Sequence, residues 1–173
     1  MESGAPPADL YARFDRMAAR APAGSRGVIF TPWLVGERTP VEDALIRGGF
    51  HNLSLDNNRC DFVRAVFEGV AYNLRWLLEG VEPFCKRRLD PLNMIGGGAK
   101  SDVWCQIHAD VLDRTIRQVR DPIRAGLRGA AFLACVALKR TTFDEIAAGI
   151  QMPTPFSPIP TIARSTISYS ENS

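Results

Sequence analysis

The sequence has few of the features that define metal-binding, secreted or membrane proteins. Its four cysteines form no CxxC pair, and only two histidines could join them as ligands, so we expect free, mostly buried thiols and no metal site. The N-terminus has no continuous apolar stretch typical of a signal peptide. The longest apolar run, residues 129–138, is too short to span a bilayer. These absences predict a cytoplasmic protein without a membrane partner.

The sequence also lacks an excess of charge of one sign. Its 21 basic and 19 acidic residues are interspersed and give a net charge of +2, so nucleic acid is not an expected partner. The 173 residues instead have an ordinary globular composition, 46% hydrophobic and 23% charged. A chain of this length buries roughly two thirds of its unfolded surface, which predicts one compact core.

Hydrophobic periodicity predicts helices and short strands in the first half of the chain. Apolar residues at helical spacing predict a helix over residues 8–20, and residues 28–30 have the pattern of a short buried strand. Residues 50–55 fit a second, edge-type strand. The strongest periodic element follows the N-cap candidates at 57–58, and we expect a helix of about six turns that ends before Pro83.

The second half continues this pattern around a run of three glycines. Residues 92–95 predict a strand that stops at Gly96-Gly97-Gly98, and Ser101 then caps a helical pattern. The remaining expected elements are a strand over residues 115–119, a largely buried helix over residues 126–138 and a short helix capped by Thr142 and ending at Ala148. Strands alternating with helices predict an α/β fold in which helices cover a sheet.

The composition changes near the C-terminus. Residues 152–173 hold four prolines and a Ser/Thr-rich end without periodicity. We therefore expect one folded domain over residues 1–151 and a disordered tail over residues 152–173.

The glycine run is the strongest candidate for a binding site. Because Gly96 to Gly98 have no Cβ, the backbone can approach a ligand there, and the helix N-terminus that follows suits a phosphate or a ribose oxygen. The same turn can equally be structural. Two known glycine motifs are excluded, because a P-loop requires a glycine where Ala99 stands, and the third glycine of a dinucleotide fingerprint falls at Ser101.

Four motifs occur in a fixed order along most of the chain. They are GVIFTPWLVGERTP (27–40), RGGFHNLSLDNNRCDFVRAVFEGVAYNLR (47–75), MIGGGAKSDVWCQIHADVLD (94–113) and GLRGAAFLA (126–134). Together they resemble the FGGY family of carbohydrate kinases, and within it the xylulokinase-like members. The third motif is similar to the adenosine motif of that family.

This resemblance implies an actin-like, ribonuclease-H-like ATPase fold, in which two α/β domains close over ATP and a sugar. It implies that the chain is a truncated C-terminal half of such a two-domain sugar kinase. The sugar contacts, the Mg²⁺-linked acids and the general base are then expected in the N-terminal half, so no catalytic residue is expected here. Because phosphoryl transfer depends on positioning and on charge neutralisation, the chain alone is expected to be inactive.

By motif matching, the resemblance assigns five residues to the contact with the adenosine of ATP or ADP. These are Gly97, Gly98, Ala99, Ser101 and Asp102. Lys100 could reach a phosphate, although a lysine in the first turn of a helix is more often solvated.

Four other charged residues have two interpretations each. Arg38 and Arg47 either line the interdomain cleft or hold turn carbonyls. Asp61 and Glu68, seven residues apart on one helix, have the spacing of paired acid–base carboxylates, but a capping role for Asp61 and a structural role for Glu68 explain them better.

The sequence leaves three functions open. The first is ATP-dependent phosphorylation of a sugar or polyol, for which this chain supplies the adenosine-binding part. The second is a non-catalytic truncated or relic domain that binds nucleotide or a partner without phosphotransfer, and the third is a stand-alone nucleotide sensor.

Without the other half, the first helix and the edge near 50–55 would be uncovered, so we expect self-association through an apolar patch that includes Phe14 and Met17.

Overall fold

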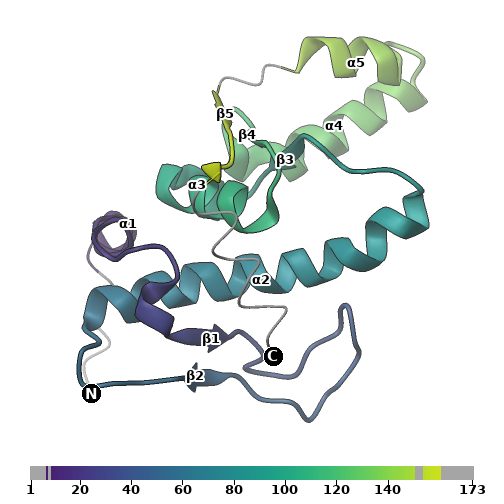
Figure 1. The fold of residues 1–173 in the computed structure, drawn as a ribbon. Helices are drawn as coiled ribbons and strands as arrows, with labels where there is room; N and C mark the ends of the chain where they lie inside the picture. The colour runs from purple at the N-terminus through teal and green to yellow at the C-terminus, as the bar shows by residue number, and fades with distance from the viewer. Residues whose placement is uncertain (1–6, 8, 151–153, 161–173) are drawn as a thin grey trace, which may run out of the picture.

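The elements of the fold are arranged around one long helix. The structure, a computed structural model, describes residue 7, residues 9–150 and residues 154–160. Helix α2 (Arg59–Cys85) lies between a small sheet of β1 (Ile29–Thr31) and β2 (Gly49–His51) and helix α3 (Asp102–Leu112) (Figure 1). Helix α1 (Leu10–Arg20) also packs on α2. The long helix predicted by periodicity is therefore the centre of the structure.

Residues next to α2 explain where it begins and ends. Asn58 Oδ1 accepts a hydrogen bond from Cys60 N at 2.9 Å, and Asp61 Oδ2 accepts one from Asn58 N at 2.8 Å. These bonds complete a capping box. The helix continues through Pro83, where the sequence predicted its end, and Lys86 terminates it with a φ of 52°. A proline inside a helix removes one N–H donor and crowds the carbonyl four residues earlier, and α2 ends two residues after Pro83.

The remaining strands form a second, three-stranded sheet that packs against α3. Strand β3 (Leu92–Met94) pairs in parallel with β4 (Ile116–Gln118), and α3 connects them. Strand β5 (Thr154–Phe156) pairs antiparallel with β4. The order β3, glycine turn, α3, β4 confirms the alternation predicted for this part of the chain.

Strand β5 corrects the predicted disorder of residues 152–173. Phe156 packs against the buried core, and Ile159 N donates a hydrogen bond to the buried carboxylate of Asp110 at 2.8 Å. Pro155 is tolerated in the strand because β5 is the outermost strand of its sheet. The prediction is therefore wrong for the described residues 154–160, and residues 152–153 and 161–173 lie outside the described part.

The hydrophobic core lies between α3, α2 and the three-stranded sheet. One cluster comprises Cys105, Ala109, Leu112 and Ile116, against which Leu78, Leu92, Met94 and Phe156 pack. A second cluster comprises Ala71, Ile107 and Val111 and joins α2 to α3. The core therefore holds α3, and with it the glycine turn, in a fixed position.

Helix α4 (Ala125–Ala137) contradicts its predicted burial. None of its residues is buried, and Leu127 and Leu133 are 72% and 59% exposed. Helix α5 (Phe143–Gly149) follows it and begins at the capping box of Thr142, as predicted. An apolar helix sequence does not specify which neighbouring element covers it. Within the described residues, no element buries the apolar side chains of α4.

Three surface predictions have different outcomes. Phe14 and Met17, expected to be exposed, are half-buried on α1. The cysteines are free as predicted, but Cys85 and Cys135 are exposed and only Cys105 is buried. No helix in the described ranges is long and apolar enough to cross a membrane.

Candidate functional site

The glycine turn joins β3 to α3. Gly96 has a φ of 86°, in the left-handed region that favours glycine. Its N–H donates a hydrogen bond of 2.9 Å to the carbonyl of Pro122, in the segment that follows β4. Residues 98–100 form a short 3₁₀ turn, and α3 begins after Ser101. The turn is thus held between the ends of two neighbouring parallel strands.

The five residues predicted to contact adenosine differ in exposure. Gly97 and Asp102 are exposed, Gly98 is half-buried, and Ala99 and Ser101 are buried. Because the side chain of Ala99 is fully buried, this residue can act only through its backbone, and its carbonyl already accepts a hydrogen bond from Gln118 Nε2 at 2.6 Å. A ligand at this turn therefore meets Gly97 and Asp102 first.

Gly97 and Gly98 are glycines for different reasons. A Cβ at Gly97 would meet no atom within 4 Å, whereas a Cβ at Gly98 would lie 2.6 Å from Cζ3 of Trp104. The Trp104 ring is fixed, because it stacks on Phe67 with centroids 4.9 Å apart and its Nε1–H donates to the Phe67 carbonyl at 3.1 Å. Gly98 is thus required by packing, and Gly97 borders open space.

The hydroxyl of Ser101 is engaged inside the protein. Its Oγ accepts a hydrogen bond from Trp104 N at 3.0 Å, which is the predicted helix cap, and donates one to Asp15 Oδ1 at 2.6 Å. A hydroxyl has one proton to donate, and Asp15 accepts it. The sequence pattern did not indicate Asp15, because this residue lies on α1, 86 positions away.

Negative charge gathers at the start of α3. Asp102 lies in the first turn, where the helix dipole favours a carboxylate, and its Oδ1 accepts a hydrogen bond from Gln118 Nε2 at 3.2 Å. Burial raises the pKa of the Cys105 thiol to about 11, and the charges of Asp102 and Asp15 contribute to the rise. Two carboxylates at this helix end suit the hydroxyl donors of a ribose better than a phosphate.

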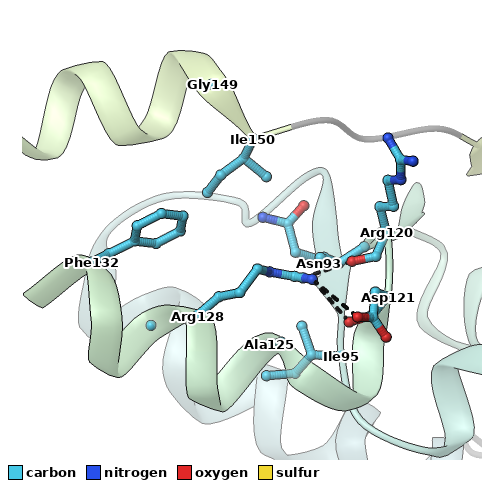
Figure 2. A pocket seen from close by; sticks show the side chains of 11 residues that line it. Asn93, Ile95, Arg120, Asp121, Ala125, Arg128, Phe132, Gly149 and Ile150 are labelled. Carbon is cyan, nitrogen blue, oxygen red and sulfur yellow. Dashed lines mark hydrogen bonds and ion pairs between the residues drawn. The ribbon is translucent and has the colours of Figure 1, made fainter.

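A pocket of about 590 Å³ lies beside the turn, between helix α4 and the ends of β3 and β4 (Figure 2). Ile95, which directly precedes the turn, and Phe132 supply apolar walls. Arg128 reaches along the pocket, and its guanidinium donates to the carbonyls of Arg120 at 2.6 Å and Asp121 at 3.1 Å. None of the five predicted adenosine contacts lines this pocket, and the sequence pattern did not indicate its arginines.

Asp61 and Glu68 have the structural roles that the sequence favoured. Asp61 is fully buried and caps α2. The Glu68 carboxylate accepts a hydrogen bond from Ser25 Oγ at 2.7 Å and pairs with Arg64 Nε at 2.7 Å. Asp61 therefore stabilises the start of α2, and Glu68 joins α2 to the turn at Ser25.

The remaining candidates are on the surface. Arg47 donates to the carbonyls of Ala44 and Ile46 at 2.9 and 2.7 Å, which favours its role in holding a turn. Lys100 and Arg38 are exposed. Within the described part of the chain, no three His, Cys, Asp or Glu side chains are grouped so that they could hold a metal ion.

Most of the chain matches one protein family. The model for the C-terminal domain of the FGGY family of carbohydrate kinases matches residues 3–138. The xylulose kinase of Staphylococcus epidermidis is 38% identical over 122 residues, which are 70% of this chain and 24% of that protein. The gluconokinase of Bacillus subtilis is 30% identical over 140 residues, 80% of this chain and 27% of that protein. The chain thus spans about a quarter of the length of these relatives.

Solved structures agree with the sequence match. The ligand-bound xylulose kinase of Lactobacillus acidophilus superposes with a TM-score of 0.77 at 33% identity, over 91% of this chain and 32% of that one. The xyloylose kinase of Brucella ovis gives a TM-score of 0.80 at 29% identity, over 93% and 34%. These neighbours are sugar kinases with the actin-like ATPase fold, which confirms the fold predicted from the four motifs. The chain belongs to the FGGY family of carbohydrate kinases and matches its C-terminal domain.

Proposed function

We propose that this chain supplies the adenosine-binding part of a xylulokinase-like, ATP-dependent kinase that phosphorylates a sugar or a polyol. Its relatives include proteins named xylulose kinase, gluconokinase and glycerol kinase. The observation that carries the proposal is the exposed Gly97 in the turn between β3 and α3, with no atom within 4 Å of the place that a Cβ would occupy.

The geometry of the turn supports a contact with the nucleoside rather than with the phosphates. The backbone at Gly97 is open to a ligand, and the exposed carboxylate of Asp102 can accept a hydrogen bond from a ribose hydroxyl. Phosphate groups are repelled by Asp102 and by the nearby Asp15. In this arrangement Gly98, Ala99 and Ser101 shape the turn from beneath.

Phosphoryl transfer also requires charge neutralisation at the γ-phosphate, which Mg²⁺ supplies when it is bound. The described residues offer no cluster of ligands for this ion. The chain spans about a quarter of the length of its relatives, and we propose that the Mg²⁺ ligands, the sugar contacts and the general base belong to a part of the kinase other than the residues described here. The contribution of this chain is then to bind and orient the nucleotide.

Gly97→Val tests this function. The valine side chain points into open space, so the free energy of unfolding should change by no more than about 0.5 kcal/mol. If the turn binds adenosine, the branched side chain occupies the ligand's place, and the Kd for ADP measured by calorimetry should rise about tenfold or more.

Gly80→Val is the matched control for this test. Gly80 is also exposed and also has no atom within 4 Å of a Cβ, but it lies on α2, outside the turn. This variant should bind ADP like the parent chain. Equal ADP affinity in the parent and in Gly97→Val would show that the turn does not contact the nucleotide.

A further inference from the structure

One side chain on α1 is hydrogen-bonded to the start of α3. Asp15 Oδ1 accepts the proton of Ser101 Oγ at 2.6 Å, and these two residues are 86 positions apart. We propose that Asp15 is a positioning residue for nucleotide binding, which holds Ser101 and, through it, the glycine turn in the geometry that the ligand needs. This inference rests on the function proposed above.

The hydrogen bond to Asp15 fixes the orientation of the Ser101 hydroxyl. Ser101 is only 9% exposed, so its proton has little access to water. With that proton directed to Asp15, a lone pair of Oγ is free to accept from Trp104 N at 3.0 Å. The bond to α1 therefore supports the N-cap of α3, since one hydroxyl serves as donor and acceptor at once.

The cap is connected to the turn through Trp104. The backbone N–H of Trp104 is the cap's donor, and its indole ring lies directly beneath Gly98, where a Cβ would come within 2.6 Å. A shift at the start of α3 therefore moves the surface on which the turn rests. Ala99 adds a second link, because its carbonyl accepts hydrogen bonds from Gln118 Nε2 and from Cys105 Sγ on α3.

Asp15 is not explained by the stability of its own helix. It lies within α1, away from the first turn, where the helix dipole favours acidic residues. The other acid near this helix, the exposed N-cap residue Asp9, instead pairs with Arg13 of α1 at 2.9 Å. Helix α1 also packs against α3 directly, so the bond from Asp15 lies within an existing contact between the two helices.

Three variants test this role by their affinity for ADP in calorimetry. Asp15→Ala removes the acceptor and should weaken ADP binding about threefold to tenfold, the equivalent of one hydrogen bond. Asp15→Asn keeps an oxygen that accepts the Ser101 proton, so it should bind ADP within about twofold of the parent chain. Asp9→Asn, which removes a charge from the exposed N-cap of the same helix, should bind like the parent. Thermal unfolding gives the folded fraction of each variant at the assay temperature.

The rescue by asparagine separates a hydrogen bond from a charge effect. If the charge of Asp15 acted only by repelling phosphate, Asp15→Asn and Asp15→Ala would both bind ADP more tightly, and this result overturns the proposal. Equal affinity of Asp15→Ala and the parent overturns it as well, as does an equal loss in both variants. If Asp15→Ala does not fold, Asp15→Leu removes the same acceptor with a side chain of similar size and a high helix propensity, and the same comparison with Asp15→Asn applies.

Absence of ADP binding by the parent chain would contradict the proposed function, and a second measurement then decides the role of Asp15. Hydrogen exchange of the amides from Gly98 to Trp104 reports the order of the turn without any ligand. Faster exchange in Asp15→Ala than in Asp15→Asn supports positioning. Unchanged exchange in Asp15→Ala overturns it.

Discussion

Gly98→Ala should destabilise this protein, although alanine is ordinarily favoured over glycine. The added Cβ would lie 2.6 and 2.8 Å from two carbons of the Trp104 ring, closer than real contacts of this kind. The ring is held by Phe67 on its face and at its N–H, so it cannot move away freely. Overpacking of this kind costs about 1–3 kcal/mol, and the reduced entropy of the unfolded chain returns about 0.4–1 kcal/mol. The difference between the central values of these ranges is a net loss of about 1.3 kcal/mol.

Urea unfolding at pH 7 measures this loss, and thermal unfolding should show a fall in Tm of roughly 2–8 °C. The matched control is Gly97→Ala, which adds the same methyl group in open space and should leave the stability unchanged or slightly raised. In a Trp104→Leu background the ring is absent, and Gly98→Ala should then cost little. A Gly98→Ala protein as stable as Gly97→Ala would refute the packing argument.

Two further predictions concern pH and catalysis. The hydrogen bond from Arg114 at 2.7 Å lowers the pKa of Glu82 below 4.5, so the stabilisation from this pair is present above pH 4.5 and is lost as the pH falls through the folded-state value. Glu82→Gln should be less stable than the parent at pH 7 and should lose less stability on acidification, as measured by urea unfolding at pH 7 and pH 3.5. The purified chain should not phosphorylate D-xylulose or glycerol in a coupled ADP-release assay. Turnover on the order of 1 per second would show that it holds a complete catalytic site.

The sequence predicted those parts of the fold that depend on neighbouring residues. The caps of α2, α3 and α5 were all identified, because each uses a side chain within three positions of the backbone group that it binds. The long helix and the strand–turn–helix order around Gly96 followed from periodicity over short windows. The family motifs then indicated the fold, which no local pattern could specify.

Predictions that depended on distant neighbours were less successful. The composition of the C-terminal segment indicated disorder, but the edge of β4 offers unpaired backbone groups with which Thr154–Phe156 pairs. Helix α4 has the apolar sequence of a buried helix, yet none of its residues is buried. In both cases the outcome is decided by whether a partner surface is present, and a single segment of sequence carries no information about its partner.

In the candidate site, too, the sequence did not indicate which distant residues each position of the turn contacts. A motif match marked the turn as one unit, yet Gly97 borders open space, Gly98 accommodates a tryptophan ring, and Ser101 is bonded to α1. A motif can include residues that shape the turn as well as residues that contact the ligand. Substitution of either kind of residue disturbs binding. Loss of binding in a Gly98 or Ser101 variant is therefore ambiguous. Gly97 can be changed without disturbing the packing beneath it, so this residue provides the direct test of whether the turn holds a nucleotide.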